Sequence, residues 1–183
     1  MPTPPDFTAY TPLAAATLNK VGSWLVKSQA VGSGVASVVV TSAFNSDFDN
    51  YFITYTGGTG SSSGAQLRIA FNVDTANSYY SNTIHQTAGV STVVGSAFGP
   101  LTGFTVIGYV DTGDFSLLLN VNNPNKALNT SMSASFTCLG GSSRTGTSGG
   151  WSIATGANTG FTFYPSAGTL TGGTICIYGY NNG

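Results

Sequence analysis

The sequence predicts an all-β domain, an antiparallel β-sandwich of the jelly-roll type, preceded by a short N-terminal arm and helix. Its composition is the first reason. Glu is absent and Lys plus Arg total 5, whereas the chain has 25 Gly, 25 Thr, 22 Ser, 11 Phe and 9 Tyr. Helix-favouring residues are therefore scarce, and strand- and turn-favouring residues are abundant. The second reason is that apolar and polar residues alternate along several short segments, with no helical crossover between them.

Charge is scarce and scattered along the chain. Charged residues make up 6% of the 183 residues, and the net charge is −1. The basic residues form no stripe that could neutralise phosphates, which argues against nucleic-acid binding and against a polybasic membrane anchor. The length fits one domain with a short arm. A surface of hydroxyls and amides lacks the charge repulsion that discourages association, which suits a protein inside a fixed assembly.

Residues 1–22 are predicted to form an anchoring arm with a short helix, and residues 23–183 the β-sandwich domain. Three prolines near the start stiffen an extended lead. Thr11 is a suitable N-cap, Pro12 fits the first helical position, and Gly22 can take the left-handed conformation that ends a helix. The apolar face of this helix is small, so we expect the arm to dock on its own β-domain or on a neighbouring subunit. No signal peptide or membrane helix is predicted.

Strands are predicted where the sequence has a period of two. Leu67, Ile69 and Phe71 alternate with Arg68 and Ala70, so that one face of this segment is buried. The glycine-rich segments 57–64 and 140–150 are predicted to be flexible hairpin connections rather than phosphate-binding loops. The predicted strands lie at 24–27, 36–40, 51–55, 67–71, 79–85, 103–110, 115–121, 131–138, 150–154, 160–165 and 173–180.

Residue types that carry chemistry are few. Cys138 and Cys176 lie far apart without a metal-ligand partner at short spacing, so the sequence favours free thiols over a disulfide. His85 is the one histidine, and no nucleophile-elbow motif accompanies it. We therefore expect a non-enzymatic protein with no catalytic residue, no metal and no cofactor.

The aspartates could serve as paired acids or as calcium ligands, but their settings favour turns. Asp47 with Asp49, and Asp111 with Asp114, lie in turn-like segments where Asp commonly bonds its own backbone. The segments 47–50 and 72–77 offer several oxygen ligands, but lack the full pattern of a calcium loop and its closing Glu.

Aromatic residues suggest a binding surface. Tyr79 and Tyr80, together with His85, are candidate contacts for a receptor or glycan, because aromatic rings stack on sugars and the surrounding Asn, Ser and Thr can bond hydroxyls. The alternative is that these tyrosines are half-buried at a subunit interface or at the edge of the core. Other candidates of the same kind are Tyr164, Tyr178 and Tyr180.

Short motifs that reach both ends of the chain carry a resemblance to a known family. They lie at 6–9, 13–19, 22–27, 48–51, 167–175 and 177–180. These motifs resemble those of tailed-bacteriophage virion proteins, especially short tail fibre or minor tail proteins with an N-terminal anchor. The resemblance implies that the residues that contribute to virion anchoring are Asp6, Phe7, Leu13, Leu18, Asn19 and Trp24.

The resemblance implies a homotrimer on the virion surface that contacts other virion proteins and a host-surface glycan, with no nucleic acid and no membrane insertion. We expect a tail fibre or receptor-binding component that takes part in host attachment and is made in the host cytoplasm. Two alternatives stay open. A capsid decoration (cement) protein that stabilises the head would share the composition and the arm, and a lectin-like carbohydrate-binding module would explain the aromatic residues.

Overall fold

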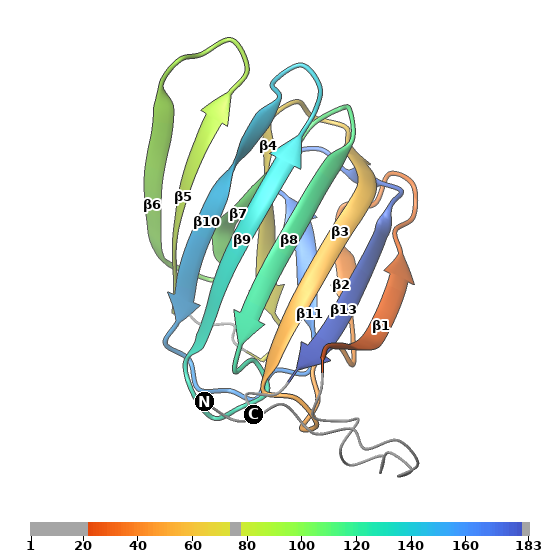
Figure 1. Cartoon of the computed structure of the whole chain (residues 1–183), viewed down its shortest axis with the longest axis vertical. Coiled ribbons are helices and arrows are strands. Elements are labelled where there is room, and N and C mark those ends of the chain that lie inside the picture. The colour runs from red at the N-terminus through yellow and green to blue at the C-terminus, as the bar shows by residue number, and fades with distance from the viewer. Residues whose placement is uncertain (1–21, 74–77, 181–183) are drawn as a thin grey trace, which may run out of the picture.

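The computed structural model describes residues 22–73 and 78–180, and these form two antiparallel β-sheets that lie face to face (Figure 1). The described residues contain no helix. The larger sheet has nine strands, in the order β1 (Trp24–Ala30), β13 (Thr174–Tyr180), β3 (Asn50–Gly60), β8 (Phe115–Asn122), β9 (Thr130–Cys138), β10 (Arg144–Ser152), β5 (Tyr79–Thr87) and β6 (Val93–Leu101), with β12 (Leu170–Thr171) also paired to β3. The smaller sheet has the order β2 (Val38–Val40), β11 (Phe161–Pro165), β4 (Ala65–Phe71) and β7 (Phe104–Val110).

The all-β prediction is confirmed, and the two facing sheets give a sandwich-like arrangement. The jelly-roll strand order is not confirmed, because the strands divide into sheets of nine and four. The predicted helix at 11–22 lies outside the described residues except for Gly22, whose φ of 94° is left-handed as expected. In the part of the chain that the structure describes, no helix is long and apolar enough to span a membrane.

Strand alternation builds the core between the sheets. Ile53 of β3, Leu119 of β8 and Ile69 of β4 are 0% exposed. Aromatic rings join the two layers, since Tyr55 of β3 stacks over Phe163 of β11 with ring centroids 6.2 Å apart. Burying each side chain of this size contributes roughly 1.5–3 kcal/mol. The predicted alternations along β4, β8 and β9 are confirmed, because their apolar residues are buried in the order expected.

The prediction that residues 140–150 form a flexible connection is wrong from Arg144 onward. This segment is the inner strand β10, paired with β9 on one side and β5 on the other. Its glycines allow close packing: a Cβ on Gly146 would collide with the carbonyl oxygen of Ile84 and lie 2.7 Å from the Cβ of His85. At Gly146 and Gly150, glycine therefore reflects close packing against β5 and not flexibility.

Several strand boundaries differ from the predicted ones: β1 extends to Ala30, β2 begins at Val38, and the strand predicted at 150–154 is the end of β10, which stops at Ser152. Residues 57–60 extend β3 beyond a bulge, and Gly57 has a left-handed φ of 71°. The sequence did not predict β6, because both of its faces are largely exposed and period-two alternation is missing.

The two cysteines are free thiols, as predicted. Cys138 lies on β9 and Cys176 on β13, and two strands, β8 and β3, separate them in the sheet. Three strand spacings amount to roughly 14 Å, which is beyond the reach of a disulfide.

Candidate functional site

The smaller sheet covers one face of the nine-stranded sheet, and no other element within residues 22–73 and 78–180 covers the opposite face (Figure 1). We call this uncovered surface the outer face. Strand alternation determines which side chains it carries, and none of them is Asp, Glu, Lys, Arg or His. From β13 to β5 the outward positions include Thr174, Cys176, Tyr178, Tyr180, Phe52, Thr54, Thr56, Ser116, Leu118, Asn120, Asn122, Ser131, Ser133, Ser135, Thr137, Thr145, Thr147, Gly149, Trp151, Tyr80, Asn82, Ile84 and Gln86.

A shallow trough lies on the outer face near the β9–β10 turn, where it is lined by Ser and Thr side chains and by Leu118. Small side chains on β8, β9 and β10 leave a depression of about 610 Å³ there. Neighbouring hydroxyls bond one another, as Thr137 Oγ1 and Thr145 Oγ1 do at 3.2 Å. The side chains that line the trough on its solvent side are Thr54, Thr56, Ser116, Leu118, Ser135, Thr137, Thr145 and Thr147.

Two stacked aromatic pairs lie on the outer face outside the trough, further along the strands than its lining residues. Trp151 of β10 is directly opposite Tyr80 of β5, with ring centroids 5.3 Å apart and planes 11° from parallel. Phe52 of β3 is directly opposite Tyr178 of β13, with centroids 4.8 Å apart and planes at 17°. Four strand spacings separate the two pairs, or roughly 19 Å across the sheet.

A second depression of about 310 Å³ adjoins the Trp151–Tyr80 pair. Asn82 places an amide in it, and Ala97 and Phe98 of β6 form its far side. Strand β6 approaches the Tyr80 ring at Gly99, whose φ is 140° and where a Cβ would lie 2.7 Å from Tyr80 Cδ1. An aromatic ring and an amide thus border one small depression.

The structure separates the three residues predicted as glycan contacts. Tyr80 lies on the outer face, but Tyr79 points the opposite way because neighbouring strand residues alternate. Tyr79 is 1% exposed, and its hydroxyl accepts a hydrogen bond from the Phe71 N–H at 3.0 Å. His85 is also buried, on the same inner side as Tyr79. The expectation that Tyr79 is an exposed aromatic is therefore wrong, and of the three only Tyr80 faces solvent.

His85 belongs to a packed cluster with Tyr109 and Arg144. Its ring lies 4.7 Å from that of Tyr109, and the Arg144 guanidinium lies 4.3 Å above the same Tyr109 ring. Arg144 Nη1 donates a hydrogen bond to the Gly64 carbonyl at 2.8 Å, and its Nε donates to Thr87 Oγ1 at 3.3 Å. Burial lowers the pKa of His85, and the nearby Arg144 charge lowers it further. The cluster thus joins strand ends around the His85 ring.

Asp111 is fully buried and connects three turns. Its Oδ1 accepts hydrogen bonds from the N–H groups of Thr112 at 2.7 Å and Gly141 at 3.1 Å, while its Oδ2 accepts from the Ser142 N–H at 2.8 Å and from Ser63 Oγ at 3.1 Å. Burial alone would raise the pKa of this carboxyl, but these hydrogen bonds outweigh it and lower the pKa below the usual value. The turn prediction for Asp111 is confirmed.

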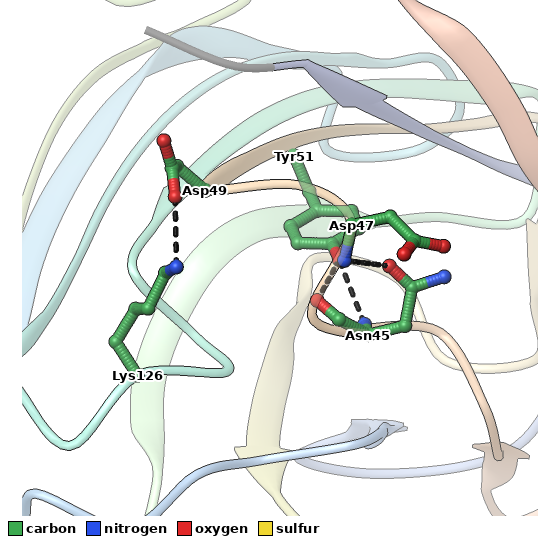
Figure 2. A network of polar contacts seen from close by, with 5 residues as sticks. All are labelled: Asn45, Asp47, Asp49, Tyr51 and Lys126. Carbon is green, nitrogen blue, oxygen red and sulfur yellow. Dashed lines mark hydrogen bonds and ion pairs between the residues drawn. The ribbon is translucent and has the colours of Figure 1, made fainter.

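Asp47 and Asp49 are also engaged in a turn (Figure 2). The N–H of Asp47 donates to Asn45 Oδ1 at 3.0 Å, and Asp49 forms a 2.9 Å ion pair with Lys126. Tyr51 fixes the start of the turn, because its hydroxyl donates to the Asn45 carbonyl at 2.9 Å and accepts from the Asn45 N–H at 2.7 Å. Within residues 22–73 and 78–180, no cluster of three or more His, Cys, Asp or Glu could hold a metal ion.

The predicted anchoring residues lie mostly outside the described part of the chain. This applies to Asp6, Phe7, Leu13, Leu18 and Asn19. Trp24 is described, at the first position of the edge strand β1, where it is 40% exposed. A solvent-accessible indole at the junction with residues 1–22 is compatible with its predicted role.

Sequence reasoning missed Trp151, Asn82 and Phe52 as surface residues of one face. Trp151 follows two glycines near the start of the strand predicted at 150–154. Its pairing with Tyr80 could not be predicted without knowing the register between the two strands.

Comparison with protein-family models, curated proteins and solved structures finds no match for this chain. The geometry of the outer face is therefore the basis for a functional proposal.

Proposed function

We propose that this chain is a non-enzymatic structural protein of a tailed-phage particle, anchored by its N-terminal segment, whose β-domain contacts the host surface. The observation that carries the proposal is the outer face, an uncovered and uncharged sheet surface with two stacked aromatic pairs. Aromatic residues are enriched at recognition surfaces because they provide large rigid contact areas. The assignment to a phage particle rests on the sequence resemblance. The proposal also includes a jelly-roll type of β-sandwich and an N-terminal helix.

The residues that could have carried catalysis have structural partners instead. Asp111 accepts hydrogen bonds from three turns, and Asp49 is paired with Lys126. His85 is buried against the ring of Tyr109. These partners favour binding over hydrolysis, and the proposal includes no cofactor.

A homotrimer is the second part of the proposal, and strand β6 supports it. In the part of the chain that the structure describes, one side of this edge strand has no paired strand, and Val93 and Val94 are 63% and 42% exposed. An exposed apolar edge strand is a template for pairing with another chain. Light scattering should give three times the 18.6 kDa mass of one chain. The double substitution Val93→Lys and Val94→Lys should lower the measured mass. A single-chain mass for the unchanged protein would contradict the trimer.

Immunogold labelling of intact particles tests the location. An antibody raised against the full chain should label the tail of the particles that carry it. Label over the capsid would identify a cement protein and would overturn host attachment. Absence of label from purified particles, with a positive signal on the isolated protein, would overturn the virion assignment itself.

A further inference from the structure

We infer that the outer face binds a neutral polysaccharide chain that crosses the strands from the Phe52–Tyr178 pair to the Trp151–Tyr80 pair. This inference rests on the proposed function, because it names the host-surface ligand that the β-domain would contact. It goes further than the sequence analysis in assigning a path across the strands, an uncharged and extended glycan, and the contact residues Phe52, Gly149 and Trp151.

The strand register defines the path. Phe52 is opposite Asn120, Asn120 is opposite Ser133, and Ser133 is opposite Gly149. Gly149 is in turn opposite Asn82, which lies beside the Trp151–Tyr80 pair in the 310 Å³ depression. We call this line of outward positions, from Phe52 to Asn82, the cross-strand row. It joins an aromatic pair to an amide, a hydroxyl, an open glycine and a second amide.

Gly149 leaves space for a ligand along the cross-strand row. It has no side chain, and a Cβ at this position would approach only Asn82 Oδ1 at 3.5 Å and the Met132 carbonyl oxygen at 3.9 Å. This contrasts with Gly146 and Gly150 on the same strand, where a Cβ would collide with the backbone of β5. Close packing does not require glycine at position 149, so its small size leaves open space on the outer face next to Trp151.

The chemistry of the row fits a neutral glycan. Sugar rings present apolar C–H faces that pack on aromatic rings and hydroxyls that bond to amides and hydroxyls, which are the groups present here. An acidic glycan would call for Arg or Lys donors. The outward positions from β13 to β5 contain neither residue. The separation of the aromatic pairs by roughly four strand spacings favours an extended chain over a single sugar.

A second copy of this chain is a less suitable occupant of the outer face. Obligate interfaces have apolar centres, with polar groups at the rim. Between the two aromatic pairs, however, the cross-strand row carries Asn120, Ser133 and Gly149, so its centre is polar. The exposed valines of β6 provide a more apolar surface for contacts between copies.

The test is titration of the full chain with neutral polysaccharides of the host surface and with their fragments of graded length. Affinity should rise with fragment length until both aromatic pairs are engaged. Trp151→Ala and Phe52→Ala should each weaken binding at least tenfold, and Gly149→Val should abolish it by filling the row. Val39→Ala, an exposed residue on the smaller sheet, is the matched control and should leave binding unchanged.

Two results would overturn the inference. One is no binding of any neutral polysaccharide by folded protein, or binding that Gly149→Val and Trp151→Ala leave intact. The other is crosslinking between copies through the outer face, which would make it a subunit interface. Tail labelling would still hold in either case, so failure of the glycan inference is distinguishable from failure of the proposed function.

Discussion

Trp151 and Tyr80 lie directly opposite each other on β10 and β5, with ring centroids 5.3 Å apart and ring planes 11° from parallel. Tyr79 is the adjacent residue, but its side chain lies in the core in edge contact with Phe104, at a centroid distance of 4.8 Å. One step along β5 therefore separates a structural tyrosine from a surface tyrosine. Substitutions at the two positions should have different consequences.

Tyr79→Ala should destabilise the fold, whereas Tyr80→Ala should not prevent folding. Removing a fully buried aromatic side chain costs about 3–5 kcal/mol through the lost burial and the cavity it leaves. Loss of the exposed stacking contact costs about 0.5–1.5 kcal/mol. Urea unfolding of both variants measures the difference. Equal losses of stability would contradict the assignment of these tyrosines to opposite faces of the sheet.

Three glycines of β10 should respond differently to alanine. Gly146→Ala and Gly150→Ala place a Cβ against the backbone of β5, and Gly150→Ala also places it 2.9 Å from the Phe104 ring. We expect each to lower the free energy of unfolding by about 1–3 kcal/mol, as overpacking does. Gly149→Ala is the control and should change it by no more than roughly 0.5 kcal/mol. Thermal and urea unfolding provide the comparison, and similar effects at all three positions would argue against the strand register described for β10.

Asp111→Asn should destabilise the three turns that Asp111 connects. The substitution removes the charge and places an NH₂ group where N–H donors of Thr112, Gly141 or Ser142 now point. Hydrogen bonds to a charged group contribute about 1.5–3 kcal/mol each, so we expect a loss of at least about 2 kcal/mol. Asp114→Asn, an exposed residue of the same turn, should have little effect. A neutral result for Asp111→Asn in urea unfolding would contradict the role of this carboxylate.

Stability should fall as the pH is lowered below about 6.5, because His85 is held neutral. Its pKa in the folded state is lower than in the unfolded state, so the unfolded chain binds more protons in this window and is favoured. Asp111 has a lowered pKa as well, and its contribution is lost only at more acidic pH, below about 3.8. Unfolding measured from pH 8 to 5 should show the His85 effect alone. His85→Phe should flatten this pH dependence, and an unchanged slope in that variant would exclude His85 as its source.

Period-two patterns predicted most strands because one face of each is buried against the other sheet. Leu67, Ile69 and Phe71 are an example, with exposures of 0%, 0% and 3%. The pattern failed at β6, where neither face is covered, and at β10, where glycines are required by the backbone of the neighbouring strand. Composition alone cannot distinguish a glycine in a tight sheet from one in a loop.

The candidate site could be predicted only in part for a related reason. Tyr80 was identifiable as an aromatic residue in a strand, but which of Tyr79 and Tyr80 faces solvent depends on the register that buries Ser81, Thr83 and His85 with Tyr79. The partnership of Tyr80 with Trp151 joins residues more than seventy positions apart, and it requires the pairing of β5 with β10. Long-range strand order is not encoded in local alternation.

Competition for host adsorption tests host attachment most directly. Full-length protein added in excess should slow the adsorption of the phage particles that carry this chain, because it occupies the same host-surface sites. Trp151→Ala protein, folded as shown by its circular dichroism spectrum, should compete much less, and Val39→Ala protein should compete as well as the unchanged chain. Adsorption that proceeds at the same rate with and without a saturating amount of the folded protein would contradict a role of the β-domain in host attachment.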